Sequence, residues 1–346
     1  MMIDEKTRDI LKNKFDKELK GDVDIKVFTH SIILGNENQE YAEITKSLMR
    51  ELSQIDGKIK PEFLSMEDEL AKKMNLTVSP TVLLGRNNKY PIQYWGAPIG
   101  PQSGVFIETI SLLSQMKSGL DSSSKGVLSS IDSDLLIETY YALNSPSAVQ
   151  TALMANKIAV ELQDKVTSRC IDAEMAKERL RNFNISAVPA VLINEEKDSL
   201  LSGTISEEKL IKKLILYGSS RKEQILSEIE EEEKKKTELT DNPDHPVTLT
   251  SSNFNEAVKR YPFLVIDCWA PWCGPCLMVH PVIEALSKRH KGKVVFGKLN
   301  IEENQEIASR FEIMSIPTLL VFKKGERKDS IIGALPEKAL EEKLGI

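Results

Sequence analysis

Cysteine is scarce in this chain of 346 residues: there are four, and only Cys273 and Cys276 stand close together. A secreted disulfide framework needs more cysteines at regular spacing, so the cysteines are not a structural scaffold. We therefore expect a cytoplasmic chain, in which cysteine serves chemistry.

Long hydrophobic runs and clusters of one charge are also missing. No stretch approaches the ~20 apolar residues of a membrane span, and residues 1–20 are charged and amphipathic without the apolar segment of a signal peptide. The net charge is −6, and lysine and arginine are spread along the chain without interleaved aromatics. The sequence thus predicts a cytoplasmic protein whose partners are neither membranes nor nucleic acids.

What the sequence does contain is a pattern that occurs three times, about a hundred residues apart. Each copy reads as strand, helix, strand and helix, followed by a strand that a proline precedes. The three prolines lie in Ser79-Pro80, Val188-Pro189 and Ile316-Pro317. Because the same X-Pro step recurs at the same place, we expect all three peptide bonds to be cis.

The repeat predicts an α/β fold of three modules, each a mixed central sheet flanked by helices, with the first two forming a tandem unit. The boundaries we expect are 1–118, 131–218 and 246–346. The Gly/Ser-rich joint at 118–130 is typical of a short flexible connection. The joint at 219–245 is a charged linker, because its like-charged blocks cannot bury a core; it is a solvated helical or disordered spacer or, alternatively, a docking helix.

The chemistry is expected at Cys273 and Cys276, which stand between a predicted strand and a predicted helix. A cysteine at a helix N-terminus is stabilised as a thiolate by free amide groups and the helix dipole. Cys273 is therefore the predicted nucleophile, with a pKa below that of a free thiol. Cys276, one turn into the helix, is expected to be more buried and to resolve the mixed disulfide.

Asp267 is the candidate base for Cys276, because it is the one carboxylate in an apolar strand. Burial raises the pKa of a carboxyl group, so that it accepts a proton near neutral pH. The alternative is a solvated Asp at the strand end. Lys298, on the next parallel strand, either pairs with Asp267 or is an ordinary surface lysine.

A metal site is the competing interpretation of the cysteines. His280 follows Cys276 by four residues on the same helix face, and Cys268 is near in sequence. Strand alternation, however, turns Cys268 away from the face of Asp267, and there is no second pair of cysteines. We therefore expect no metal and no cofactor, and we interpret His280 as a helix-face residue.

Residues 246–346 contain Trp-Cys-Gly-Pro-Cys at 272–276, together with Asp267, Trp269, Pro281, Ile316-Pro317-Thr318 and Gly333-Ala334. With these residues the segment resembles thioredoxin over nearly its whole length. It implies an apolar groove for the extended backbone of a substrate, formed by Trp272, Ile316, Pro317 and Gly333. The departures, Ser315 for the usual glycine and Leu277 for a frequent basic residue, concern partner preference. In related proteins, a Gly-Pro pair between the cysteines accompanies reducing potentials; here this pair is Gly274 and Pro275.

Three segments of residues 1–217, at 94–100, 138–143 and 187–191, carry a second resemblance. Through them, residues 1–217 resemble the N-terminal tandem of thioredoxin folds in the alkyl hydroperoxide reductase flavoprotein, and also protein disulfide oxidoreductases. The family's second copy carries two cysteines directly after the Tyr-Tyr strand, where this chain has Ser145-Pro146-Ser147-Ala148; the turn of the first copy, near 39–42, also lacks cysteine. Ser145 is expected only to cap the next helix. Cys170 is interpreted as a spectator thiol or, alternatively, a regulatory one.

These features predict a thioredoxin-type protein disulfide reductase whose only redox centre is Cys273 with Cys276. The resemblance implies a flavin-dependent thioredoxin reductase as electron donor and disulfide-bearing proteins as targets, a peroxiredoxin among them. Residues 1–217 are expected to act as a docking or substrate-binding module. The alternatives are a scaffold or chaperone-like protein, or a disulfide isomerase, in which that tandem sets the function.

Overall fold

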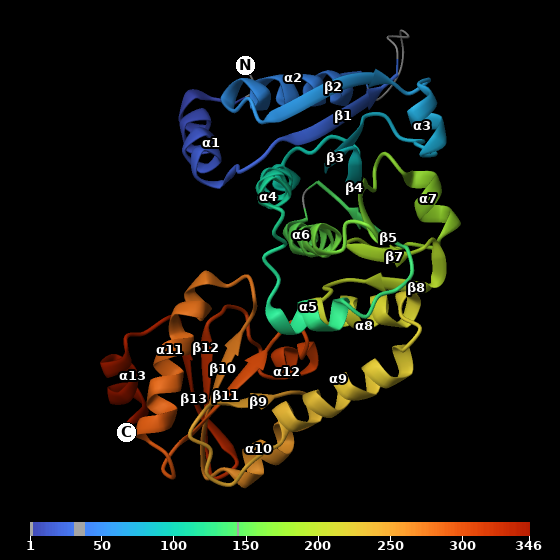
Figure 1. Cartoon of the computed structure of the whole chain (residues 1–346). Coiled ribbons are helices and arrows are strands. Elements are labelled where there is room, and N and C mark those ends of the chain that lie inside the picture. Colours follow the sequence, from blue (N-terminus) through green and yellow to red (C-terminus); the bar gives the residue numbers. More distant parts are fainter. Residues whose placement is uncertain (1–2, 31–38, 144) are drawn as a thin grey trace. The chain divides into compact units, whose positions relative to one another are not determined.

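The computed structural model describes residues 3–30, 39–143 and 145–346. The chain divides into two compact units, Met1–Leu226 and Ser227–Ile346, which Figure 1 draws in blue to yellow and in gold to red. Each unit is built around its own β-sheet.

The second unit contains a five-stranded mixed sheet in the order β13-β12-β10-β11-β9. Strand β10 lies at its centre, parallel to β11 and antiparallel to β12. The strands are β9 (Val247–Leu249), β10 (Phe263–Trp269), β11 (Val295–Asn300), β12 (Thr318–Lys323) and β13 (Glu326–Ile332), and the helices are α10 (Phe254–Arg260), α11 (Gly274–Arg289), α12 (Gln305–Arg310) and α13 (Glu337–Leu344).

Alternation along β10 sorts its side chains onto the two faces of this sheet. Leu264, Ile266 and Cys268 join a core cluster with α10 and α12. Val265 joins the opposite cluster, with α11 and α13. Asp267, two positions after Val265, therefore faces α11.

The first unit has one eight-stranded sheet in the order β2-β1-β3-β4-β6-β5-β7-β8. It consists of two four-stranded halves that meet where β4 pairs in parallel with β6. The strands are β1 (Val23–Thr29), β2 (Ile59–Ser65), β3 (Thr81–Arg86), β4 (Lys89–Trp95), β5 (Leu135–Tyr141), β6 (Val166–Asp172), β7 (Ala190–Ile193) and β8 (Glu196–Ser202). The helices are α1 (Glu5–Glu18), α2 (Gln39–Ile55), α3 (Glu69–Lys73), α4 (Pro101–Gln115), α5 (Ser122–Leu128), α6 (Pro146–Glu161), α7 (Lys177–Asn182) and α8 (Glu207–Gly218), and α9 (Lys222–Thr237) runs from the first unit into the second.

The predicted repeat is visible in the backbone of all three modules. The bonds Ser79-Pro80, Val188-Pro189 and Ile316-Pro317 are all cis, which confirms that prediction. Each proline carbonyl accepts a hydrogen bond, of 2.8–2.9 Å, from a later glycine: Gly96, Gly203 and Gly333. These glycines have φ between 80° and 125°, a region that side chains disfavour. The predicted fold class, mixed sheets flanked by helices, is confirmed.

The Gly/Ser-rich joint is more ordered than its composition indicated, whereas the charged joint agrees with the expected helical spacer. The Gly/Ser-rich joint contains helix α5, so the expected flexible connection is wrong in this part. Asp121 caps this helix by accepting a hydrogen bond from the Ser124 amide at 2.8 Å, and Leu128 is fully buried. The charged joint is largely helix α9, in which Ile225 is the buried residue.

Candidate active site

The dithiol lies where β10 passes into α11. Cys273 is the N-cap of α11, and its sulfur accepts a hydrogen bond from the Cys276 amide at 3.2 Å. The two cysteines form a disulfide with their Cα atoms 5.2 Å apart, so the structure is that of the oxidised chain. Cys273 is 4% exposed and Cys276 is fully buried, which places Cys273 nearer to solvent. The strand and helix expected from the sequence therefore position the pair as predicted.

Apolar side chains surround the dithiol. Ile316 packs against the buried cluster that the two cysteines form with Ala270, and Pro317 follows Ile316 in the cis peptide. Gly333 is held to Pro317 by its amide, at 2.8 Å. Trp272 is about half exposed, and its indole nitrogen donates to Glu302 at 2.7 Å. Gly274 and Pro275 are exposed in the first turn of α11.

Asp267 is a fully buried carboxyl group on the α11 face of the sheet. Neither of its oxygens has a hydrogen-bond partner among the described residues. Burial raises the pKa of this group to about 7, against which the positive charge of Lys298 acts. A carboxyl group with such a pKa is suited to exchange protons near neutral pH.

Lys298 and His280 approach Asp267 from different elements. Lys298 stands opposite Asp267 in the β10–β11 register, but its ammonium pairs with Glu284 of α11 at 2.9 Å. His280, which the sequence left as a plain helix-face residue, places Nε2 3.5 Å from Asp267 Oδ2. Its ring also packs edge-on against Trp269.

The sequence did not indicate three contacts of the site: that of Glu284 with Lys298, that of Glu302 with Trp272, and that of His280 with Asp267. Each of them joins residues that are far apart along the chain. The only available signal was helical spacing, because His280 follows Cys276 by one turn and Glu284 follows His280 by another.

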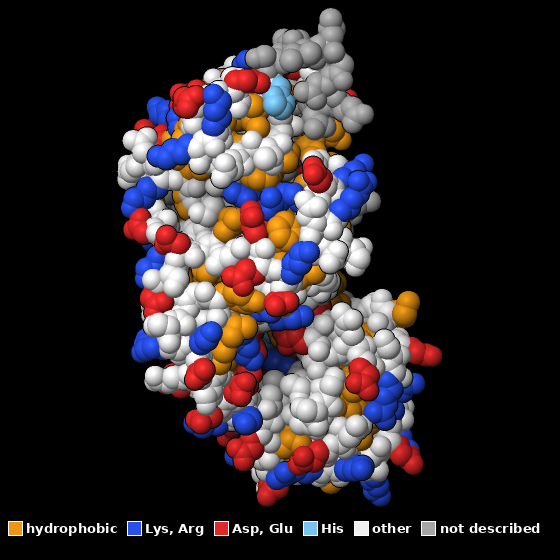
Figure 2. Space-filling view, turned by 90° about the vertical axis from the view of Figure 1, so that its right-hand side faces the viewer, with side chains coloured by type: hydrophobic (Ala, Val, Ile, Leu, Met, Phe, Trp, Pro, Cys, Tyr) orange, Lys and Arg blue, Asp and Glu red, His pale blue; other side chains and the backbone are white. Residues whose placement is uncertain are grey.

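The described residues contain no group of three or more His, Cys, Asp or Glu side chains that could hold a metal ion. Within the same residues, no helix combines the length and apolar character that crossing a membrane requires. On the face drawn in Figure 2, acidic and basic side chains are interspersed over both units.

The strand register identifies the positions in the first unit that correspond to the dithiol site. In the third module, Asp267 pairs with the strand residue that lies two places after the cis-proline Pro317. The residue that pairs with the same position after the cis-proline is Thr139 in the second module and Val27 in the first. Ser145, at the N-cap of α6, corresponds to Cys273. Both thiol and carboxyl chemistry are thus replaced in the second module. In the first, residues 31–38 before α2 lie outside the described residues, and no cysteine occurs between 30 and 42.

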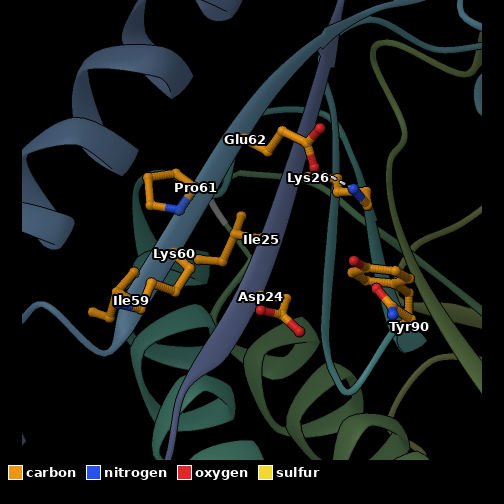
Figure 3. A pocket seen from close by; sticks show the side chains of 9 residues that line it. Asp24, Ile25, Lys26, Ile59, Lys60, Pro61, Glu62 and Tyr90 are labelled. Atoms are coloured by element: carbon orange, nitrogen blue, oxygen red, sulfur yellow. Dashed lines mark hydrogen bonds and ion pairs between the residues drawn. The ribbon is translucent and has the colours of Figure 1, made fainter.

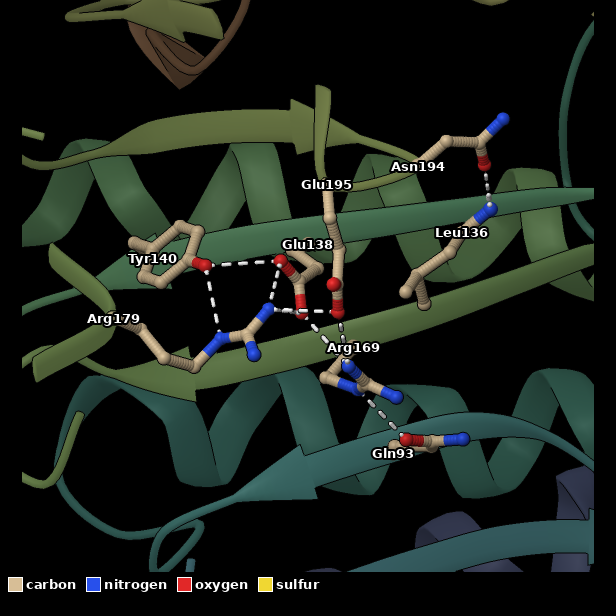
Figure 4. Close-up of polar contacts among 8 residues, drawn as sticks. All are labelled: Gln93, Leu136, Glu138, Tyr140, Arg169, Arg179, Asn194 and Glu195. Atoms are coloured by element: carbon tan, nitrogen blue, oxygen red, sulfur yellow. Dashed lines mark hydrogen bonds and ion pairs between the residues drawn. The ribbon is translucent and has the colours of Figure 1, made fainter. Parts of the chain in front are cut away.

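The first unit instead holds a buried ionic cluster, seen in Figure 4. Glu138 is fully buried and accepts hydrogen bonds from Arg169 at 2.8 Å and from Arg179 at 2.7 Å. Arg179 also binds the half-exposed Glu195, and Arg169 lies 4.1 Å from the centre of the Trp95 ring. Two arginines face two carboxylates, so the cluster is balanced in charge and ties β5, β6 and α7 together.

Two further features of the first unit, a buried cysteine and a surface hollow, do not provide a second dithiol site. The thiol of Cys170 is fully buried, and burial raises its pKa to about 12, so it is not a reactive thiolate. A surface hollow of about 390 Å³ beside β1 and β2, shown in Figure 3, contains no cysteine, and two of its charged residues, Lys26 and Glu62, form an ion pair with each other.

Comparison with known proteins gives a consistent result for the second unit. The family model for thioredoxin matches residues 245–345. The thioredoxin of Alicyclobacillus acidocaldarius is 46% identical over 98 residues, which are 28% of this chain and 93% of that protein. The thioredoxin of Staphylococcus haemolyticus is 48% identical, with the same coverage of 28% and 93%.

Solved structures resemble the chain over a longer stretch. The alkylhydroperoxide reductase AhpF of Enterococcus faecalis aligns with a TM-score of 0.54 and 21% identity, covering 62% of this chain and 100% of that one. A protein disulfide oxidoreductase from Aeropyrum pernix aligns with a TM-score of 0.53 and 22% identity, covering 65% and 95%. At these identities the likeness shows a shared fold for the N-terminal part.

Proposed function

The chain belongs to the thioredoxin family and is a thiol–disulfide oxidoreductase; from this premise we propose that it reduces protein disulfides with Cys273 and Cys276. The observation that carries the proposal is the placement of Cys273 at the N-cap of α11, nearer to solvent than Cys276. Free amides and the helix dipole there favour its thiolate.

In the proposed reaction, the Cys273 thiolate attacks one sulfur of a substrate disulfide, and the other substrate sulfur leaves. Cys276 then loses its proton to Asp267 and attacks Cys273, which releases the second substrate thiol. Asp267 is the proposed base because it is buried, faces α11 and has a pKa of about 7.

The exposed apolar side chains of the second unit support a docking role for the rim of the dithiol. Trp272 precedes Cys273, Leu277 and Met278 follow Cys276, and Met314 precedes the cis-proline; all are at least half exposed. We propose that a substrate segment lies on these residues and on Ile316, Pro317 and Gly333, as it does in the family.

The partners are also proposals. A flavin-dependent thioredoxin reductase is the proposed electron donor, in a cytoplasmic setting, and a peroxiredoxin is one proposed target. The first unit is proposed to select targets, because its equivalents of Cys273 and Asp267 are Ser145 and Thr139.

The test is disulfide reduction by variants of the full chain. Cys273→Ser is expected to lower turnover by roughly 10³-fold or more, because the nucleophile is gone. Cys276→Ser is expected to accumulate a mixed disulfide on Cys273, seen as added mass. Cys170→Ala is the matched control and keeps full activity. Unchanged turnover in Cys273→Ser contradicts the proposal.

A further inference from the structure

His280 is the polar side chain that lies against the buried carboxyl of Asp267. Its Nε2 is 3.5 Å from Asp267 Oδ2, and neither of these two atoms has a hydrogen-bond partner among the described residues. The His280 ring is fixed by its edge contact with Trp269, with the centroids 4.8 Å apart. The fold therefore holds the His280 ring beside the Asp267 carboxyl, although no hydrogen bond joins the two side chains in this structure.

The position of His280 connects the reacting groups to solvent. It lies one turn beyond Cys276 on the same face of α11, the helix that Asp267 faces. The side chain of His280 is 18% exposed, whereas that of Asp267 is 0% exposed. A proton on Asp267 thus has in His280 an adjoining group that reaches the surface.

The other neighbours of Asp267 in the sheet are not suited to this proton transfer. Lys298 of β11 is engaged with Glu284 of α11 at 2.9 Å, and the residue opposite Asp267 on β12 is Leu319. Cys268 points to the opposite face and lies in the other core cluster.

We propose that His280 is a positioning residue that relays the proton between Asp267 and solvent during the second step of disulfide reduction. The inference rests on the proposed function and extends it. Cys276 gives its proton to Asp267, and its thiolate forms the bond to Cys273 as the bond from Cys273 to the substrate breaks. The proton then passes from Asp267 to His280 Nε2, and the imidazolium releases a proton from Nδ1 to water.

The acidities of the two groups agree with this relay. Burial and the charge of Lys298 lower the pKa of His280, while Glu284 acts in the opposite direction. Burial raises the pKa of Asp267 to about 7. Near neutral pH Asp267 can therefore both hold and release a proton, and His280, with its lowered pKa, presents a neutral imidazole that can accept one.

A single-turnover experiment with the reduced full chain in excess over dithiobis(nitrobenzoate) separates the two steps. The attack by Cys273 releases the first coloured thiolate, and the attack by Cys276 releases the second. For His280→Gln and His280→Ala we expect an unchanged first release and a second release slowed about tenfold near pH 6.5, with its pH midpoint displaced. His290→Gln is the matched control, because His290 ends the same helix but binds Glu341.

The outcomes distinguish the relay from the function it rests on. If the unaltered chain releases no second thiolate, the proposed function itself fails. If both His280 variants show a second release with the normal rate and pH midpoint, or if both releases slow equally, the relay is overturned. An unchanged first release also shows that the variants are folded.

Discussion

The carboxyl group of Asp267 combines full burial with the absence of any hydrogen-bond partner among the described residues. Its pKa is about 7 in the folded chain and ordinarily near 4 in an unfolded one. Below pH 4 both states are protonated, and above pH 7 both are ionised. Between these values folding requires a proton, so this group makes the second unit less stable as pH rises from 4 to 7.

Asp267→Asn removes this ionisable group. We predict that the substitution raises the free energy of unfolding of the second unit more at pH 8 than at pH 5, by about 2–4 kcal/mol. Urea unfolding of the oxidised full chain measures it, with the transition of the second unit identified by its shift on reduction of the Cys273–Cys276 disulfide. The same gain at both pH values would assign the effect to packing instead of ionisation.

Residues close together in sequence were the ones that could be predicted. Cys273 and Cys276 form a local motif at a strand-to-helix junction, and Asp267 was recognisable as a carboxylate in an apolar strand. The contact of His280 with Asp267 depends on how α11 crosses β10, and sequence spacing does not specify a crossing. The pairing of Lys298 with Glu284 was missed for the same reason.

At the scale of elements, the ionic cluster around Glu138 holds two strands and a helix of the first unit together. Glu138→Gln would leave Arg169 and Arg179 without their shared buried carboxylate. We predict a loss of about 3–5 kcal/mol in the free energy of unfolding of the first unit. Glu195→Gln is the matched control: this carboxylate is 46% exposed and should cost less than about 1 kcal/mol.

The measurement is the unfolding transition of the first unit, together with the dithiol activity of the second. The loss is expected in the first and not in the second, because the cluster lies wholly within Met1–Leu226. An equal, small effect of both substitutions would show that the cluster contributes little to stability.

Helix α5 shows why composition misjudged one element. Serine and glycine around residue 122 are typical of a loop, and their helix propensity is low. The Asp121 cap, the hydrogen bond from Ser124 to Glu207 at 2.6 Å and the burial of Leu128 act together in the opposite direction. The hydrogen bond to Glu207 of α8 and the burial of Leu128 are tertiary features, which a local pattern does not contain.

At the scale of the whole molecule, the three copies of the module differ in how their sheets pair and in whether they contain the dithiol. The repeat, the cis-prolines and the fold class followed from the sequence, because each copy carries its own strand and proline pattern. The parallel pairing of β4 with β6, which joins two copies into one sheet, did not, since strand order between modules has no local signature. The third copy has its own sheet and retains the dithiol.

This division leads to a prediction about target selection. The full chain and its fragment 227–346 are compared on dithiobis(nitrobenzoate), on insulin and on an oxidised peroxiredoxin. If the first unit docks targets, the fragment should equal the full chain on the small disulfide, and its kcat/KM on the docked protein should fall about tenfold or more, equivalent to about 1.4 kcal/mol of lost binding. Equal values on all three substrates would mean that the first unit does not direct electrons to these targets. A uniform loss would point to a damaged fragment, which the small disulfide reveals because it requires only the dithiol.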